Sequence, residues 1–192
     1  LSIGRVNPMT VEPGWVCDVL GGWFAELEKP QWFKKDDAVD AAIEQRFASV
    51  HGEVSDSDLV ALTASPRIAL AAVIVLDQFS RNMFRGTPAS FASDAKALDL
   101  ANQILQRGLD VSLSEDEKAF CYLPLAHSEV LKDQERCVEL FRALGNENYL
   151  GYAQAHLDVI EKFGRFPHRN AILGRVSTPE EIEFLAQPGS GF

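Results

Sequence analysis

The feature that most constrains the fold is the alternation of helix-start and helix-stop residues along the chain. Three dipeptides combine a Ser or Thr at the N-cap with a proline at the first helical position, where its missing N–H costs nothing. They begin at Ser65, Thr87 and Thr178. Two pairs also have capping-box spacing, Ser114 with Glu117 and Thr178 with Glu181. Helical stretches run out at glycines suited to left-handed C-terminal caps, Gly86, Gly108, Gly145 and Gly164.

Between these signals, apolar residues repeat with the period of an α-helix. The sequence predicts helices over residues 13–28, 37–52, 57–63, 66–85, 88–107, 115–130, 133–144, 147–163 and 179–187. The apolar run 68–76 could by periodicity be a buried strand, but it lies within a long capped segment, and length favours a helix. We therefore expect a central helix that is buried all round, and no strand.

Successive long helices with short connections predict antiparallel neighbours, as in a bundle or a superhelix of helix pairs. No internal sequence period indicates a repeat array. A chain of 192 residues fits one domain. We expect a single all-helical domain over 13–192, preceded by a disordered or tag-like segment over 1–12.

Composition limits the partners and the compartment. The formal net charge of −10 disfavours nucleic acid and anionic membranes as partners. The longest apolar run, nine residues, is too short to cross a bilayer. Three cysteines without C-x-x-C spacing argue against a disulfide framework or a zinc site. We expect a cytoplasmic protein without metal or cofactor.

Residues 163–175, FGRFPHRNAILGR, concentrate positive charge in this acidic chain. Arg165, Arg169 and Arg175 occur together with His168, and no acid lies between Lys162 and Pro179. Gly164 and Pro167 predict a structured turn rather than a continued helix. The partners of these arginines must therefore come from elsewhere: Asp77, Glu129, helix C-terminal carbonyls or a bound anion.

A second polar cluster ends the central helix, in LDQFSRNMFRG over residues 76–86. Helical spacing puts Asp77, Arg81 and Arg85 in one row, in which the two arginines repel unless an acid or an anion lies between them. The cluster is either a buried network that ties helices together or the floor of an anion pocket.

The histidines allow two interpretations. His127 and Glu129 are two residues apart and share no helix face, so they are a weak metal signal but could serve as acid or base. Equally, His127 could cap or bridge helices. His156 lies on an apolar helical stripe, where a histidine is usually a core residue.

These motifs together resemble a known family, domain of unknown function 924. The similarity rests on WF at 32–33 and on the stretches 76–98, 124–135 and 163–181, in that order. The resemblance implies an all-helical fold classed with tetratricopeptide-like superhelices, and no activity. Serine stands at position 80 where many relatives have proline, which is expected to leave the helix regular. The family's polar motifs correspond to Asp77, Gln78, Arg81, Asn82, Arg85, His127, Glu129, Gln134, Arg165, His168, Arg169, Asn170 and Arg175.

Three functional hypotheses follow. The first is a polar pocket for an anionic small molecule or an acidic peptide. Its predicted ligand-binding residues are Gln78, Arg81, Asn82, Arg85, Glu129, His156, Arg165, Arg169, Asn170 and Arg175. The alternative is a hydrolase or transferase acting on a phosphate or carboxylate ester, with His127, His168 and Asp77 as catalytic residues. In the third, the polar residues are only structural. The sequence does not indicate an oligomeric state.

Overall fold

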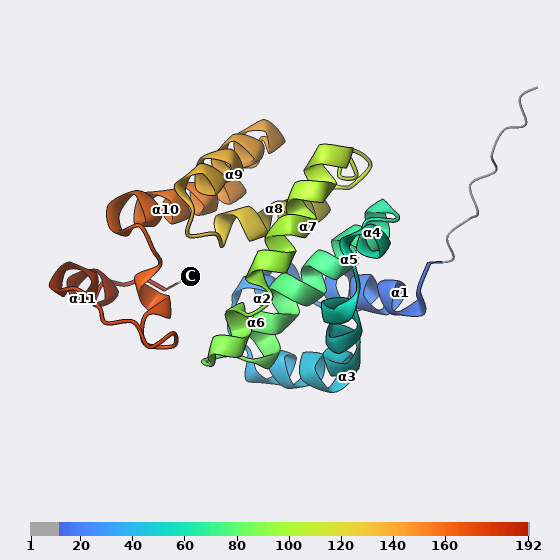
Figure 1. The fold of residues 1–192 in the computed structure, drawn as a ribbon, viewed down its shortest axis with the longest axis horizontal. Coiled ribbons are helices and arrows are strands. Elements are labelled where there is room, and N and C mark those ends of the chain that lie inside the picture. The colour runs from blue at the N-terminus through green and yellow to red at the C-terminus, as the bar shows by residue number, and fades with distance from the viewer. Residues whose placement is uncertain (1–11, 192) are drawn as a thin grey trace, which may run out of the picture.

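A computed structural model of the protein describes residues 12–191. The fold is all-α, and no strand occurs within this range. The helices pack around a central layer that contains α5 (Pro66–Val73), α6 (Ser80–Met83) and α7 (Asp94–Arg107) (Figure 1). The predicted tag-like segment lies, apart from its last residue, outside the described residues.

The remaining α-helices follow in chain order. They are α1 (Gly14–Gly21), α2 (Lys29–Phe33), α3 (Asp37–Asp56), α4 (Leu59–Leu62), α8 (Glu115–Ala126), α9 (Leu131–Leu144), α10 (Glu147–Phe163) and α11 (Pro179–Leu185). Two π-helical turns, Gly22–Glu26 and Ile74–Phe79, and two 3₁₀ turns, Pro88–Phe91 and Pro167–Arg169, complete the helical structure.

Most of the predicted helix caps are present, although the central helix ends at Met83, with Phe84 rather than Gly86 as the residue that follows its last turn. The Ser65 hydroxyl accepts a hydrogen bond from the backbone N–H of Ile68, and both predicted capping boxes are present. The left-handed C-terminal caps are also confirmed: φ is 64° at Gly108, 80° at Gly145 and 68° at Gly164. Local sequence therefore sets where these helices begin and end.

The Thr87 cap was predicted wrongly. Its hydroxyl donates to the Phe84 carbonyl instead of accepting from the next helix, and only the 3₁₀ turn Pro88–Phe91 follows. The regular helix starts later, at Asp94. This shift matters for the site, because it places the Asp94 carboxylate at the first turn of α7.

The predicted helix 66–85 is interrupted by the π-helical turn Ile74–Phe79 and ends at Met83. The prediction of a regular helix around Ser80 was therefore wrong. The Ser80 hydroxyl donates to the Leu76 carbonyl within the helix and receives a hydrogen bond from His51 Nε2. π-Helical turns are rare and frequently occur at functional sites, and this one carries Asp77 and Gln78.

Two further differences concern helix ends near the site. The short helix α2 was not predicted, and α8 ends at Ala126 rather than at 130, with His127 as its C-terminal cap residue. Pro124 lies within α8 without ending it. Helix α10 has the predicted bounds.

The main core surrounds the central layer, where residues 68–76 are almost fully buried. The aromatic residues near the start of the chain contribute to it. The Trp23 ring makes edge-to-face contacts with Phe79 at 5.7 Å and with Phe120 at 5.5 Å between centroids. Consecutive helices from α7 to α10 contact one another in sequence, and α9 and α10 lie side by side (Figure 1).

The C-terminal part has a small apolar cluster of its own. Val159, Ile160 and Phe166 are buried there, and Phe163 packs against Phe184 of α11 at 5.2 Å between ring centroids.

None of the helices in residues 12–191 is long and apolar enough to cross a bilayer. The tetratricopeptide-like superhelix stays a prediction.

Candidate ligand-binding cavity

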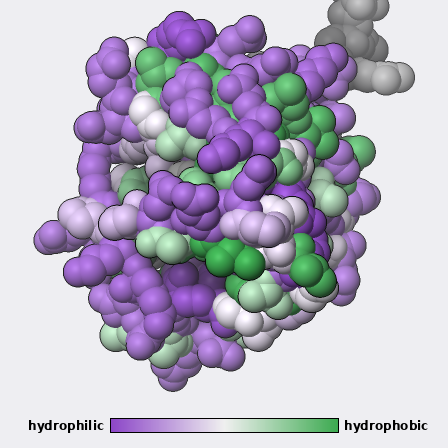
Figure 2. Space-filling view, turned by 90° about the vertical axis from the view of Figure 1, so that its left-hand side faces the viewer, coloured by the Kyte–Doolittle hydropathy of each residue, from purple (hydrophilic) through white to green (hydrophobic). Residues whose placement is uncertain are grey.

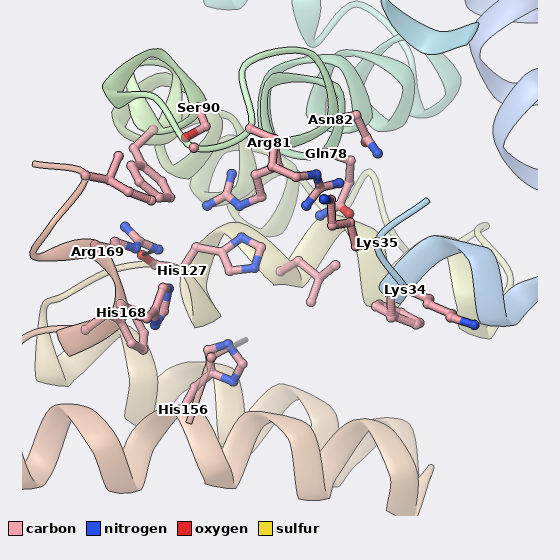
Figure 3. Close-up of a pocket in the computed structure, with 18 of the residues that line it drawn as sticks. Lys34, Lys35, Gln78, Arg81, Asn82, Ser90, His127, His156, His168 and Arg169 are labelled. Atoms are coloured by element: carbon pink, nitrogen blue, oxygen red, sulfur yellow. Dashed lines mark hydrogen bonds between the residues drawn. The ribbon is translucent and has the colours of Figure 1, made fainter. Parts of the chain in front are cut away.

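A cavity of about 400 Å³ lies between the central layer, α8, α10 and the turn that follows α10. Its wall includes polar and aromatic side chains from segments far apart in the sequence (Figure 3). Seen from the side of α10 and α11, most of the molecular surface is hydrophilic, with apolar residues visible among the polar ones (Figure 2). The described lining residues are Trp32, Phe33, Lys34, Lys35, Gln78, Arg81, Asn82, Arg85, Gly86, Ser90, Phe91, Leu123, His127, Tyr152, His156, Phe166, His168, Arg169, Ile172 and Gly191.

The charged side chains among the described lining residues are all basic. Five Lys or Arg side chains and three histidines line the cavity, and no Asp or Glu does so within the described part of the chain. Eight of the predicted site residues are among the lining residues: Gln78, Arg81, Asn82, Arg85, His127, His156, His168 and Arg169. The structure thus brings together three motifs that the sequence separates.

Asp77 lies directly behind this wall and is fully buried. Its Oδ1 accepts a hydrogen bond from His127 Nδ1 at 2.7 Å and lies 3.2 Å from Arg81 Nη1. Its Oδ2 accepts from Gln78 Nε2 at 2.6 Å. Burial alone would raise the pKa of this carboxyl, but Arg81 and His127 outweigh burial and hold the pKa well below its usual range. Asp77 is therefore an anion at neutral pH.

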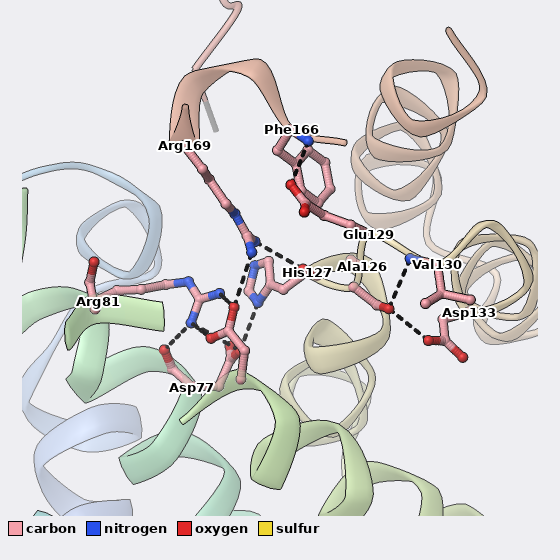
Figure 4. A network of polar contacts seen from close by, with 12 residues as sticks. Asp77, Arg81, Ala126, His127, Glu129, Val130, Asp133, Phe166 and Arg169 are labelled. Atoms are coloured by element: carbon pink, nitrogen blue, oxygen red, sulfur yellow. Dashed lines mark hydrogen bonds and ion pairs between the residues drawn. The ribbon is translucent and has the colours of Figure 1, made fainter. Parts of the chain in front are cut away.

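The two central arginines are joined by Asp94. Arg81 Nη1 donates to Asp94 Oδ1 at 3.0 Å, and Arg169 Nη1 donates to Asp94 Oδ2 at 3.1 Å. Arg169 Nη2 also donates to the backbone carbonyl of His127 at 2.9 Å. With the Asp77 contacts, these bonds form a closed polar ring of Asp77, Arg81, Asp94, Arg169 and His127 (Figure 4).

The polar ring fixes the orientation of His127. Because Nδ1–H donates to Asp77, the opposite ring nitrogen, Nε2, carries the lone pair, and it has no hydrogen-bond partner among residues 12–191. Burial and the charge of Arg81 lower the pKa of His127, although Asp77 opposes this shift. The neutral imidazole is therefore the form present at pH 7, and it can accept a proton.

The other two histidines of the wall are also neutral at pH 7. Burial, followed by the influence of His127, lowers the pKa of His156 to about 3. Burial and the charge of Arg169 lower the pKa of His168 to about 4. His156 Nδ1 donates to the Tyr152 carbonyl at 2.9 Å, which fits its expected place on an apolar stripe, yet its ring also borders the cavity.

The guanidinium group of Arg169 packs against two aromatic rings and is largely buried. Its guanidinium carbon lies 4.6 Å from the centroid of the Phe91 ring and 4.8 Å from that of Phe166. Its side chain is only 8% exposed, and its Nε–H is buried without an acceptor among the described residues. Burial and the charge of Arg81 lower its pKa. A buried donor without a partner costs free energy.

Four predicted ligand-binding residues are not among the residues that line the cavity, and ligand contact stays a prediction for them. Arg165 forms a two-pronged ion pair with Glu181, at 2.7 Å from Nε and 2.8 Å from Nη2. Asn170 is buried and donates to Ser177 and to Glu181. Both side chains therefore fasten the turn 164–175 to α11.

Glu129 and Arg175 are the other two. Arg175 Nη1 donates to Glu129 Oε2 at 2.7 Å, and Glu129 Oε1 accepts from the backbone N–H of Phe166. Burial would raise the pKa of Glu129, but Arg175 and the Phe166 N–H hold it below its usual range. The ion pair with Arg175 and the backbone hydrogen bond to Phe166 fix the position of the turn.

Arg85 and Asn82 border the cavity but share a partner on α3. Arg85 Nε donates to Asp40 Oδ2 at 2.6 Å, and Asn82 Nδ2 donates to Asp40 Oδ1 at 2.7 Å. The predicted row of Asp77, Arg81 and Arg85 is thus formed only in its first pair, because the helix ends before Arg85. Arg85 thus pairs with Asp40, and Arg81 pairs with Asp94. These carboxylates reduce the repulsion between the two arginines, for which the sequence analysis expected an acid or an anion.

Sequence reasoning missed several residues of the wall. Lys34 and Lys35 lie in the connection between α2 and α3, and no motif marked them. Phe33 and Phe91 were not identified as residues of the site either. Among residues 12–191, no group of three or more His, Cys, Asp and Glu side chains is placed to hold a metal ion.

Comparison with known proteins agrees with the fold. A family model described as bacterial protein of unknown function, DUF924, matches residues 19–189. The chain belongs to this family. A protein of unknown function from Agrobacterium tumefaciens, ATU0120, has a solved structure that is 38% identical in sequence, with a TM-score of 0.85. The match covers 90% of this chain and 97% of that one. No curated protein matches.

Proposed function

We propose that this DUF924 protein binds a small anionic molecule in the cavity. The observation that carries the proposal is the wall itself, in which five Lys or Arg side chains face a space of about 400 Å³ that no described Asp or Glu borders. Cavities of roughly 300–1,000 Å³ are typical of small-molecule sites. An acidic peptide, the other predicted partner, would need a longer groove.

The net positive charge around the cavity is smaller than the five Lys and Arg side chains of its wall alone would give. Asp77, Asp94 and Asp40 lie behind the arginines and compensate most of their charge. Binding must therefore depend on directed N–H donors rather than on net charge. The exposed ammonium groups of Lys34 and of Lys35, which also lies 3.1 Å from Asp37 Oδ1, are donors of this kind.

Thermal unfolding with inorganic phosphate, methyl phosphate and succinate tests the proposal, with affinities from calorimetry. A ligand at one hundred times its dissociation constant stabilises the native state by about 2.7 kcal/mol. We expect Arg85→Gln and Lys35→Gln each to weaken binding by about tenfold, as for the loss of one charged donor. Arg46→Gln is the matched control, because Arg46 forms an exposed ion pair with Glu26 away from the cavity.

Two outcomes would contradict anion binding. One is the absence of stabilisation by any of these anions. The other is an equal loss of affinity in the Arg46→Gln control, which would assign the effect to general surface charge.

A second function, ester hydrolysis, is favoured by the pair of Asp77 and His127. We propose that His127 Nε2 accepts a proton from water, that the resulting hydroxide attacks the phosphorus or carbonyl carbon, and that the ester bond breaks. His127 then returns the proton to the leaving oxygen. Asp77 is the positioning residue, since it holds the imidazole by Nδ1 at 2.7 Å. His168, the other predicted catalytic residue, lines the cavity, but the carboxylate of Asp77 is bonded to His127.

Hydrolysis of p-nitrophenyl phosphate and p-nitrophenyl acetate tests this second function. We expect His127→Gln to lower kcat by about 10²-fold or more while phosphate affinity changes little. Asp77→Asn should lower kcat and shift its pH profile, because the imidazole loses its fixed tautomer. Equal rates for wild type and His127→Gln with both esters would rule out this role.

A further inference from the structure

Aromatic rings also line the same cavity. Five of the described lining residues are Trp, Phe or Tyr: Trp32, Phe33, Phe91, Tyr152 and Phe166. An inorganic anion needs no such surface. The composition of the wall therefore indicates that the ligand carries an apolar part as well as a charge.

Phe33 shows where this apolar part is accommodated. It is the last residue of α2 and is 51% exposed, although its neighbour Trp32 is buried. Its ring is held from behind, stacked on Phe120 at 6.0 Å between centroids with an interplanar angle of 4°. A ring fixed by packing and exposed on one side loses little conformational freedom when a ligand covers it.

Lys and Arg side chains lie next to two of the aromatic residues of the wall, Phe33 and Phe91. Lys34 and Lys35 follow Phe33 directly in the chain and line the cavity beside it. On the other side, the guanidinium carbons of Arg81 and Arg169 lie 5.8 Å and 4.6 Å from the centroid of Phe91. Positive charge and aromatic surface are thus interleaved around one space.

We propose that the ligand is a small aromatic anion, a planar ring that carries a phosphate or carboxylate group. This inference rests on the proposed anion binding and specifies the class of molecule. The ring packs against Phe33, and the anionic group accepts hydrogen bonds from the guanidinium and ammonium groups of the wall. A ring of this kind fits a cavity of about 400 Å³ together with its charged substituent.

Calorimetric titration with three related compounds tests the inference. Phenyl phosphate carries both parts, methyl phosphate only the anion, and phenol only the ring. We expect phenyl phosphate to bind at least about tenfold more tightly than methyl phosphate, from the burial of one ring. We expect phenol to bind more weakly than either.

Two variants of Phe33 test whether its ring causes the tighter binding of phenyl phosphate. Phe33→Ala should remove most of the advantage of phenyl phosphate and leave methyl phosphate binding unchanged, while Phe33→Leu should retain part of it. Phe163→Ala is the matched control, because Phe163 is partly buried against α11 and does not line the cavity. Circular dichroism confirms that each variant is folded, and Phe33→Leu serves if Phe33→Ala is not.

The possible failures are distinguishable. Equal affinities for phenyl phosphate and methyl phosphate would overturn the aromatic class and leave anion binding intact. No binding of any phosphate would overturn both. A short peptide of aspartates and glutamates that binds more tightly than phenyl phosphate would overturn the small-molecule ligand in favour of an acidic peptide.

Discussion

Asp77 is the residue on which the candidate site depends most directly. It is an ionised carboxylate without contact to solvent, and it is kept so by Arg81, His127 and Gln78. A buried charge is tolerated only when its partners compensate the loss of hydration. Any change to Asp77 therefore affects both the fold and the orientation of His127.

Asp77→Asn should lower the free energy of unfolding by about 3 kcal/mol, because it leaves the charge of Arg81 only partly compensated. Urea denaturation measures the loss. Asp37→Asn is the control, since the Asp37 side chain is 84% exposed and its ion pair with Lys35 should contribute less than about 1 kcal/mol. Equal stability of Asp77→Asn and wild type would mean that the ion pair is not required.

Among individual residues, the sequence predicted some of the ion-pair partners and missed others. The pair of Asp77 and Arg81 follows from a spacing of four residues on one helix, and Glu129 was named as a possible partner of the arginines in the turn. Asp94 and Glu181 were not identified as partners. The partner of Arg169 lies 75 positions away in the chain, and no local pattern indicates such a pairing.

Among the elements, α11 shows how a short helix is held in place. Glu181, in its first turn, accepts hydrogen bonds from Arg165, from Asn170 and from the backbone N–H of Thr178. The hydrogen bonds of Arg165, followed by those of Thr178 and Asn170, lower the pKa of Glu181 to about 2, although burial opposes the shift. One carboxylate thus joins α11 to the turn that carries Arg169.

Glu181→Gln should loosen α11 and the turn 164–175 without unfolding the main core. We expect amide hydrogen exchange to become faster over residues 164–185 and to stay unchanged over α5 and α7. Glu180→Gln, one residue earlier in the same helix turn and exposed, is the control. Uniformly faster exchange in both regions would show that α11 is not a separate unit.

Capping residues explain why helix boundaries were largely predictable, and the π-helical turn Ile74–Phe79 shows the limit. Amphipathic periodicity reveals a shift of register only when a helix has distinct faces. Residues 68–76 are buried on every side, so an extra residue in one turn leaves no trace in their pattern. The small helix α2 was missed for a different reason, because five residues span too little of the period.

Over the whole molecule, all four histidines share one property. Burial lowers the pKa of His51 and is the leading cause of the lowered pKa of His127, His156 and His168. They lie on α3, at the end of α8, on α10 and in the turn after α10. Native packing as a whole therefore disfavours histidine protonation.

The free energy of unfolding should fall as the pH is lowered from about 6.5 to about 4. In this range unfolded histidines bind protons that native ones do not, so acid favours the unfolded state, by at most about 1.4 kcal/mol per pH unit for each histidine. Urea denaturation between pH 5 and pH 7.5 measures the slope. The carboxylates with lowered pKa, Asp77 and Glu181, lose their contribution only below about pH 4.5.

His156→Gln should reduce this slope by the contribution of one histidine, whereas Gln154→Asn, a change at a partly exposed position without a titratable group on the same helix, should leave it unchanged. A free energy of unfolding that is constant between pH 7.5 and pH 5 would contradict the lowered pKa values.

The closed polar ring of Asp77, Arg81, Asp94, Arg169 and His127 has a consequence for the order of folding. Its members belong to the central layer, the end of α8 and the turn after α10, so none of the helical hairpins formed early could contain it. We therefore expect the cavity and this ring to form only when these segments have packed together. In a stopped-flow refolding experiment, a bound ligand would therefore report on molecules that have completed folding and would not detect intermediates that already have full helix content.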